Sequence, residues 1–320
     1  MITTRFTELV GCTVPIQQAG MGAAAPPELA AAVSEAGGLG MLGTARRGLT
    51  AITLADLLEQ VRLLTDKPFG VNFIVAPVFL NGTSTLPPLD LKCIEIAARA
   101  AKVVEFFYGE PERRLVEMVH AGGALACWQV GSREEAIAAA KAGCDFVIAQ
   151  GVEAGGHVRG TTPVMTLLGE VIAAVDVPVL AAGGIGTGRA MATALAAGAD
   201  GVRVGTRFVA AAEAAVHPEY VAALIAAEAQ DTAYTEAFSV GWPDAPHRVL
   251  RSSIAAAEAL EGDVVGETTG WDAGTDPSLP SLRPRQDHDG RGRGDAALGG
   301  RISRRSEAYP SGGANSAGTG

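Results

Sequence analysis

The chain is poor in lysine, in aromatic residues and in cysteine for its length. Of its 320 residues, 5% are aromatic and four are lysine, namely Lys67, Lys92, Lys102 and Lys141. Acidic residues outnumber basic ones, so the formal net charge at pH 7 is -10. Negative charge disfavours binding to phosphate-rich polymers and to anionic lipids. We therefore expect neither nucleic acid nor a membrane surface as a partner.

The four cysteines, Cys12, Cys93, Cys127 and Cys144, are far apart and form no C-x-x-C pair. Zinc sites need cysteines or histidines at close, regular spacing, so we expect no metal site. A catalytic nucleophile or a disulfide is the alternative. Small buried thiols in a reducing compartment are the preferred interpretation.

Long hydrophobic runs are also missing. A membrane-spanning helix needs about 18 or more apolar residues without charges or helix breakers, and the sequence has no such stretch. The first eight residues lack the apolar segment of a secretory signal. The sequence therefore predicts a cytoplasmic protein.

What the chain does contain is a regular alternation of short apolar runs and alanine-rich helical segments. Hydrophobic residues make up 48% of it, which is enough for a large core. The predicted strands are Val14–Gln17, Leu39–Leu42, Phe69–Ile74, Val103–Phe106, Ala124–Trp128, Asp145–Ala149, Val177–Ala181 and Gly201–Val204. The clearest predicted helices between them are Pro26–Ala36, Leu54–Leu64, Arg133–Ala142 and Arg189–Ala197.

Eight strand–helix units of this spacing predict a parallel (β/α)8 barrel of the TIM type. The alternative is an open, doubly wound sheet. Such a sheet usually carries G-x-G-x-x-G after its first strand, and the first turn here, Gln18–Gly22, does not match. The barrel is the preferred fold.

Three regions follow from the pattern. Residues 1–230 are predicted to form the barrel, and residues 231–274 a small, mostly helical appendage over the barrel mouth, with a helix at Ser253–Leu260. Residues 275–320 are rich in arginine and glycine and contain one aromatic residue, Tyr309. That composition predicts a disordered tail.

A lone histidine stands on a glycine-rich turn after the sixth predicted strand, in the stretch Gln150–His157. A lone histidine is ordinarily a loop or solvent-facing residue. In a parallel barrel, however, the working groups lie on loops at the carboxyl ends of the strands. This placement favours His157 as a general base or hydrogen-bonding group.

Two further glycine-rich loops follow the seventh and eighth predicted strands, at Ala181–Gly186 and Gly205–Phe208. One Gly-Gly pair alone is ordinarily a tight turn. Two such loops on adjacent strands, one of them preceding a helix, predict a phosphate site built from backbone N–H groups and the hydroxyl of Thr206. The implied ligand is a phosphate-bearing cofactor or substrate.

Taken together, these motifs resemble the nitronate monooxygenase family, formerly called 2-nitropropane dioxygenases. The resemblance covers residue 1 to about residue 270 and implies a TIM barrel that binds FMN. The residues that carry it are Pro15–Ile16, Gly20–Gly22, Gly37–Gly40, Pro68–Asn72, Gln150–Gly151, Glu153–His157, Ala182–Ile185 and Gly205–Phe208.

The resemblance implies FMN-dependent oxidation of an alkyl nitronate, such as propionate 3-nitronate, by dioxygen to a carbonyl compound and nitrite. His157 would be the catalytic residue, acting as a base or as a hydrogen-bond donor to the nitronate. Asn72 and Gln150 would hydrogen-bond the isoalloxazine ring, and Met21 would pack beside it. The implied cofactor-binding residues are Gly20, Met21, Gly22, Asn72, Gln150, Gly155, Gly156, Gly183, Gly184, Gly205 and Thr206. The expected partners are the small nitronate and dioxygen, with a homodimer as the candidate assembly.

Two other functions stay open. A flavin-dependent, NAD(P)H-using enoyl-acyl-carrier-protein reductase resembles the chain at the Gly-Gly-His turn and at the phosphate loops. The third hypothesis is a damaged flavin-binding barrel with little activity. It arises from the stretch Leu282–Ile302. If its codons are chosen freely, reading the same DNA one nucleotide out of frame can give a segment that resembles the usual carboxyl-terminal segment of the family. A frameshift near residue 282 is preferred over a genuine tail, and loss of that segment would weaken FMN binding.

The remaining candidates receive ordinary interpretations. His120, His217 and His247 have no carboxylate at metal spacing and are expected to be structural. Trp242 is expected to lie in a loop that lines the substrate pocket. Arg207 is expected to pair either with phosphate or with a helix-end carbonyl.

Overall fold

The computed structural model describes residues 2–45, 49–75, 89–237 and 245–259, together with the dipeptides 285–286 and 292–293. Within these residues, eight parallel strands form one sheet. They are β1 (Ile16–Gln18), β2 (Gly40–Gly43), β3 (Phe69–Ile74), β4 (Val103–Phe107), β5 (Leu125–Val130), β6 (Phe146–Gln150), β8 (Val179–Ala182) and β9 (Gly201–Val204). All eight predicted strands are confirmed, with small shifts at their ends.

The sheet is closed into a barrel. Its strands follow the order β1-β9-β8-β6-β5-β4-β3-β2, and β1 then meets the residue just before β2. There the Gln18 N–H donates to the Leu39 carbonyl, and the Leu39 N–H donates to the Ile16 carbonyl, each with an N···O distance of 2.9 Å. The predicted TIM barrel is confirmed, and the open doubly wound sheet is excluded.

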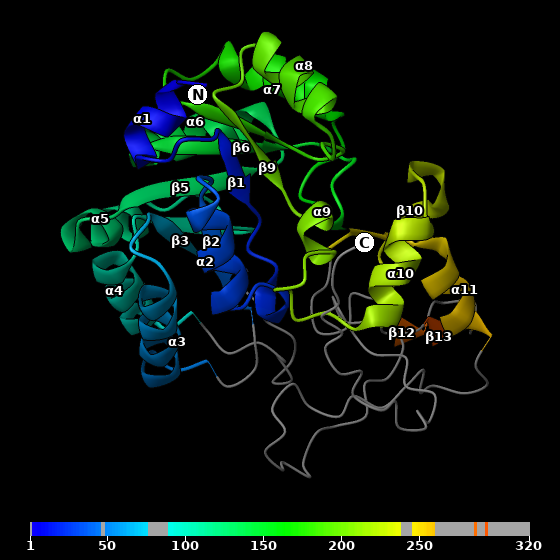
Figure 1. The fold of residues 1–320 in the computed structure, drawn as a ribbon. Helices are drawn as coiled ribbons and strands as arrows, with labels where there is room; N and C mark the ends of the chain where they lie inside the picture. The colour runs from blue at the N-terminus through cyan, green and yellow to red at the C-terminus, as the bar shows by residue number, and fades with distance from the viewer. Residues whose placement is uncertain are drawn as a thin grey trace, which may run out of the picture.

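Helices surround this barrel (Figure 1). They are α1 (Arg5–Val10), α2 (Pro27–Glu35), α3 (Ala51–Leu64), α4 (Leu91–Ala100), α5 (Arg113–Gly122), α6 (Arg133–Ala142), α7 (Val164–Ile172), α8 (Gly188–Ala196) and α9 (Thr206–Val209), with a short 3-10 helix, η1 (Gly22–Ala24). Capping residues in the local sequence determine where these helices begin and end. In α6, for example, the Ser132 hydroxyl accepts the Glu135 N–H, and Gly143 ends the helix with a left-handed φ of 102°.

The amino-terminal end of the barrel is filled by apolar side chains. Phe6 of α1 is fully buried and meets Phe146, the first residue of β6, edge to face at a centroid distance of 5.4 Å. Leu39, Met41 and other residues of the strand interiors pack in the same cluster. Because this end is filled, the opposite end, where the strands terminate, is the one that can receive a ligand.

The chain after the barrel adds α10 (Pro218–Ala226), a 3-10 turn η2 (Ala229–Asp231), β10 (Thr232–Thr235), β11 (His247–Leu250) and α11 (Arg251–Glu258). Figure 1 shows α10, β10 and α11 gathered on one side of the barrel. The predicted helix at Ser253–Leu260 corresponds to α11. The prediction of a mostly helical appendage needs correction, because β10 and β11 pair in antiparallel fashion. Their β-branched and aromatic residues suit a strand better than a helix.

Several sequence predictions lie outside the described residues. Of the tail, the structure describes only β12 (Arg285–Gln286) and β13 (Gly292–Arg293), which pair antiparallel. The predicted disorder of the rest of the tail, the proposed frameshift near residue 282 and the position of Trp242 all fall on undescribed residues.

The cysteines behave as ordinary core residues. All four are free and buried. Burial raises the pKa of Cys12 to about 11 and that of Cys144 to about 12. The predicted burial of the thiols is confirmed, and because the thiolate is the reactive form, the raised pKa values disfavour a nucleophilic role. As for membrane association, none of the helices within the described ranges has the length and apolar character to cross a bilayer.

Candidate active site

Three glycine-rich segments meet at the carboxyl ends of β6, β8 and β9. A Cβ added to Gly155 would lie 2.5 Å from the Thr206 Oγ1, and one added to Gly183 would lie 3.0 Å from the Gly151 carbonyl oxygen. Gly183 and Gly184 have φ angles of 112° and 67°, which favour glycine. Gly155, Gly184 and Thr206 are exposed. The structure therefore brings the predicted phosphate loops together, with bare backbone and a hydroxyl facing solvent.

The first strand contributes a fourth segment beside them. A Cβ added to Gly205 would lie 3.3 Å from the Ala19 Cβ and 3.9 Å from the Met21 sulfur. Met21 and Phe208 of α9 both pack against the buried cluster of Ala25, Leu29 and Val33. Gly22 turns the chain here with a φ of 55°. The predicted Gly20–Gly22 segment thus adjoins the β9 loop.

His157 lies not in a free loop but in a short strand. Gly156 and His157 form β7, which pairs antiparallel with β11, so that His157 and His247 are direct cross-strand partners. The two imidazole centroids are 5.3 Å apart, and the Tyr108 ring meets His157 edge to face at 5.8 Å. His247 was predicted to be structural. The structure places it, buried, as the cross-strand neighbour of the candidate catalytic residue.

The surroundings keep His157 neutral. Burial, and secondarily the neighbouring His247, lower the pKa of His157 from 6.5 to about 3. Burial also lowers the pKa of His247. A neutral imidazole carries one N–H donor and one acceptor nitrogen. Of the two roles expected for His157, hydrogen bonding to an anionic substrate is favoured over proton abstraction, because so weak a base is poorly matched to pH 7.

Gln150 shapes this segment from inside the barrel. Its Nε2 donates to the His157 carbonyl at 2.9 Å, and its Oε1 accepts the Arg159 N–H at 3.0 Å. Its buried amide thus fixes the backbone on both sides of Val158, and thereby the position of His157. The prediction that Gln150 binds the cofactor ring stays a prediction.

Tyr108 has an unusual backbone. Its φ of 84° lies in the left-handed region, where bulky residues are rare. Such backbone conformations are strained and cluster at functional sites. The Arg159 guanidinium lies over the Tyr108 ring, with its carbon 5.6 Å from the ring centroid. Tyr108 and Arg159 together form one wall beside His157, and neither was singled out from the sequence.

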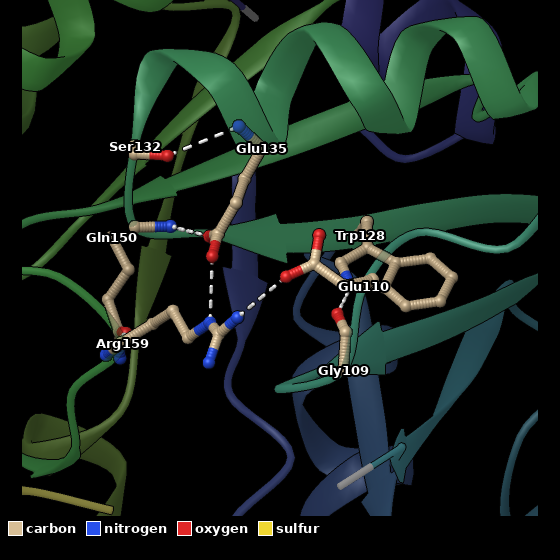
Figure 2. Close-up of polar contacts among 8 residues, drawn as sticks. Gly109, Glu110, Trp128, Ser132, Glu135, Gln150 and Arg159 are labelled. Carbon is tan, nitrogen blue, oxygen red and sulfur yellow. Dashed lines mark hydrogen bonds and ion pairs between the residues drawn. The ribbon is translucent and has the colours of Figure 1, made fainter. Parts of the chain in front are cut away.

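Arg159 is itself held by two carboxylates (Figure 2). Its Nε donates to Glu135 at 2.8 Å, and one terminal nitrogen lies 3.4 Å from Glu110. Glu135 also accepts the Gly131 N–H at 2.7 Å, which ties Arg159 to the turn after β5. Trp128 donates to the Gly109 carbonyl at 3.1 Å, next to Tyr108. The wall beside His157 is therefore built on a fixed polar network.

Asn72 is buried next to the Gly20–Gly22 segment. Its side chain is 2% exposed, and a Cβ on Gly20 would lie 2.3 Å from the Asn72 Cβ. Asn72 donates to Glu105 at 2.7 Å. The structure thus places Asn72 beneath the Gly20 backbone, within a polar layer of the barrel. Among the described residues, no group of three or more histidine, cysteine or acidic side chains is arranged to hold a metal ion.

The lowered pKa of His157 leads to an expected pH dependence of stability. An unfolded histidine has a pKa of about 6.5, whereas folded His157 has a pKa of about 3. The unfolded chain therefore binds more protons between these values. The free energy of unfolding is expected to be highest above pH 6.5 and to fall as the pH is lowered toward 3.

Urea denaturation from pH 8 to pH 4 measures this dependence. His157→Gln removes the titrating ring, so the difference between wild type and variant isolates the histidine from the carboxylates. We expect a shallower decline in the variant. Equal slopes would show that His157 does not contribute.

Comparisons with known proteins agree with the fold. FabK from Thermotoga maritima superposes with a TM-score of 0.70 at 38% identity, covering 78% of this chain and 75% of that one. A nitroalkane oxidase from Streptomyces ansochromogenes gives a TM-score of 0.66 at 32% identity, covering 77% and 79%. A Rhodococcus jostii protein named (3aS,4S,5R,7aS)-5-hydroxy-7a-methyl-1-oxo-octahydro-1H-indene-4-carboxyl-CoA dehydrogenase is 37% identical over 267 residues, which is 83% of this chain and 70% of the relative. The fold and the relatives together show that this protein is an oxidoreductase with a TIM-barrel fold.

The family follows from the sequence profile. The profile described as nitronate monooxygenase matches residues 3–261. A Pseudomonas aeruginosa protein named nitronate monooxygenase is 37% identical over 276 residues, covering 74% of this chain and 78% of the relative. The chain belongs to the nitronate monooxygenase family, as the motifs in its sequence predicted.

Proposed function

We propose that this protein oxidises alkyl nitronates, such as propionate 3-nitronate, with dioxygen and bound FMN, giving a carbonyl compound and nitrite. The observation that carries the proposal is the meeting of His157 with three bare glycine segments at one end of a barrel of this family. The glycine segments suit a phosphate, and the neutral imidazole suits an anionic substrate.

The residues present fit FMN. Gly155, Gly184 and Thr206 are exposed, so the backbone N–H groups of the two glycines and the Thr206 hydroxyl are open to an anion. Gln129, near the end of β5, is 3% exposed, and its Oε1 has no hydrogen-bond partner within the described part of the chain. Gln129 therefore offers a buried acceptor that a ring N–H can satisfy. Bound FMN would supply the electron transfer between nitronate and dioxygen.

In this proposal the protein itself positions the substrate. His157 donates an N–H to the nitronate oxygens, since the nitronate arrives already deprotonated and needs no strong base. Gln150 holds the His157 backbone, and the Tyr108 ring packs against the imidazole. Tyr108 and Arg159 close one side of the site, where a half-buried guanidinium lies on the phenol ring.

Purification and an absorbance spectrum test the cofactor, and steady-state kinetics test the reaction. We expect a yellow protein that releases FMN on heating. Oxygen uptake and nitrite formation are expected with propionate 3-nitronate. A protein that binds no FMN would contradict the proposal. FMN binding without nitronate-dependent oxygen uptake would contradict its substrate.

A second candidate is favoured by one comparison. FabK from Thermotoga maritima, at 38% identity, is closer in sequence than the nitroalkane oxidase, at 32%. The alternative function is the NAD(P)H-dependent reduction of an enoyl thioester, consistent with the resemblance to enoyl-acyl-carrier-protein reductase. NADH oxidation that requires an enoyl thioester, in a protein that consumes no oxygen with nitronate, would decide for this alternative.

The phosphate site leads to a separate expectation. Gly155→Ala would place a methyl group 2.5 Å from the Thr206 hydroxyl and force that side chain away from the loop. We expect FMN affinity to fall about tenfold, a loss of about 1.4 kcal/mol, while riboflavin affinity stays unchanged because riboflavin has no phosphate. Quenching of flavin fluorescence measures both.

Gly169→Ala is the matched control, because a Cβ at this α7 position meets no atom within 4 Å. The control should bind FMN as the wild type does. If Gly155→Ala weakened FMN and riboflavin equally, the phosphate would lie elsewhere.

A further inference from the structure

A buried carboxylate lies in the centre of the barrel. Glu105 of β4 is fully buried. Its Oε1 accepts a hydrogen bond from Asn72 at 2.7 Å, and its Oε2 accepts one from Gln17 at 2.7 Å. A terminal guanidinium nitrogen of Arg203 lies 2.6 Å from Oε1 and forms an ion pair with it. Two amide donors and a guanidinium are surroundings that suit an ionised carboxylate. Burial raises the pKa of Glu105, and the charge of Arg203 opposes that effect.

This carboxylate dictates how the Asn72 amide is turned. The two ends of an asparagine amide look alike, and only the hydrogen-bond partners tell them apart. Glu105 can only accept, so the Asn72 Nδ2 must face it. The Oδ1 then faces away, on the side of the Gly20 backbone, where a Cβ on Gly20 would lie 3.0 Å from it. Asn72 therefore presents an acceptor, not a donor, toward the Gly20–Gly22 segment.

We propose that Glu105 is a positioning residue that fixes Asn72 as a hydrogen-bond acceptor for a ring N–H of the cofactor. The proposal rests on the proposed FMN site. An isoalloxazine ring carries both N–H and carbonyl groups, so an amide free to turn would recognise it less selectively. Glu105 removes that freedom, and Arg203, as its counter-charge, favours the ionised carboxylate, which can only accept. The pair acts from inside the barrel without touching the substrate.

A double-mutant cycle on FMN affinity tests this coupling. In Glu105→Gln the new amide can donate as well as accept, so Asn72 is free to turn over. We expect Glu105→Gln and Asn72→Ala each to weaken FMN binding about tenfold. The double variant is expected to lose about tenfold in total rather than about a hundredfold, because Glu105 acts through Asn72. If the double variant lost about a hundredfold in FMN affinity, the product of the two single losses, the proposal would be overturned.

Gln17→Met is the matched control. It removes another donor to Glu105, on the opposite carboxylate oxygen, and leaves the Asn72 contact in place. FMN affinity should stay within about twofold of wild type. A tenfold loss in this control would show that any disturbance of the layer weakens FMN, which would also overturn the proposal.

A spectroscopic measurement keeps the proposal testable if Glu105→Gln fails to fold. Infrared spectra of bound FMN report hydrogen bonds to the ring carbonyls. If Asn72 accepts from a ring N–H, Asn72→Ala should leave the carbonyl stretches without an upward shift. An upward shift would show that Asn72 donates to a carbonyl, and would overturn the assignment. Failure of the wild type to bind FMN would refute the proposed function itself, a result distinct from either of these.

Discussion

Replacing His157 with alanine is expected to lower nitronate oxidation by about 100- to 10,000-fold, the range typical of a positioned proton-handling or hydrogen-bonding side chain. FMN should remain bound, because the glycine segments and Asn72 are untouched. The local backbone should also persist, since Gln150 bonds the His157 carbonyl and not its ring. The measurement is kcat/KM from oxygen uptake, with each protein first saturated with FMN.

His217→Asn is the matched control for this substitution. His217 caps α10 through its side chain, which accepts the Glu219 N–H, and asparagine can accept the same bond. The control should keep wild-type turnover. Turnover of His157→Ala within about threefold of wild type, below the smallest effect expected of such a group, would remove His157 from the mechanism.

Replacing Arg203 with methionine is expected to destabilise the fold by about 3–5 kcal/mol, the usual cost of leaving one member of a buried ion pair alone. Arg203 is 6% exposed and Glu105 is fully buried, with 2.6 Å between the terminal guanidinium nitrogen and the Glu105 Oε1. In the single variant Glu105 keeps its two amide donors but loses its counter-charge. Urea denaturation at pH 7 measures the change in the free energy of unfolding.

The double variant Arg203→Met with Glu105→Gln should recover most of that loss, because no buried charge remains. Arg133→Met provides a matched control at an exposed ion pair. There the Arg133 and Glu134 side chains are 49% and 78% exposed, and their charged groups lie 3.6 Å apart. Such pairs contribute at most about 1 kcal/mol. Equal losses of stability from Arg203→Met and Arg133→Met would show that the buried pair contributes no more than an exposed one.

The barrel was predictable because local sequence patterns specify each of its strands and helices. Each strand reads as a short apolar run, and glycines such as Gly37 and Gly143 end helices at left-handed φ angles of 91° and 102°. Eight repeats of that unit leave little choice of topology. The meeting of the glycine-rich loops was predictable for the same reason, since chain order fixes which loops share the barrel mouth.

The site around His157 was less predictable because it depends on distant pairing. No local pattern shows that Gly156 and His157 form a strand, or that His247 is their neighbour. Tyr108 gave no signal, since a left-handed φ at tyrosine is imposed by its surroundings. The sequence does carry a signal for Glu105 and Arg203. A single charge stands within each apolar run, Val103–Phe107 and Gly201–Val204, and opposite charges buried in one barrel need each other.

The pairing of β7 with β11 also bears on the order in which the protein becomes active. The barrel strands end at Val204, and every glycine segment of the proposed phosphate site has been synthesised by Thr206. The strand that borders His157 comes only with residues 247–250, and long-range pairings of this kind form late in folding. A nascent chain can therefore complete its barrel, and the loops proposed to bind phosphate, before its histidine is in place. The protein would then acquire cofactor binding first and turnover second. Activity would appear only once β11 has paired with β7.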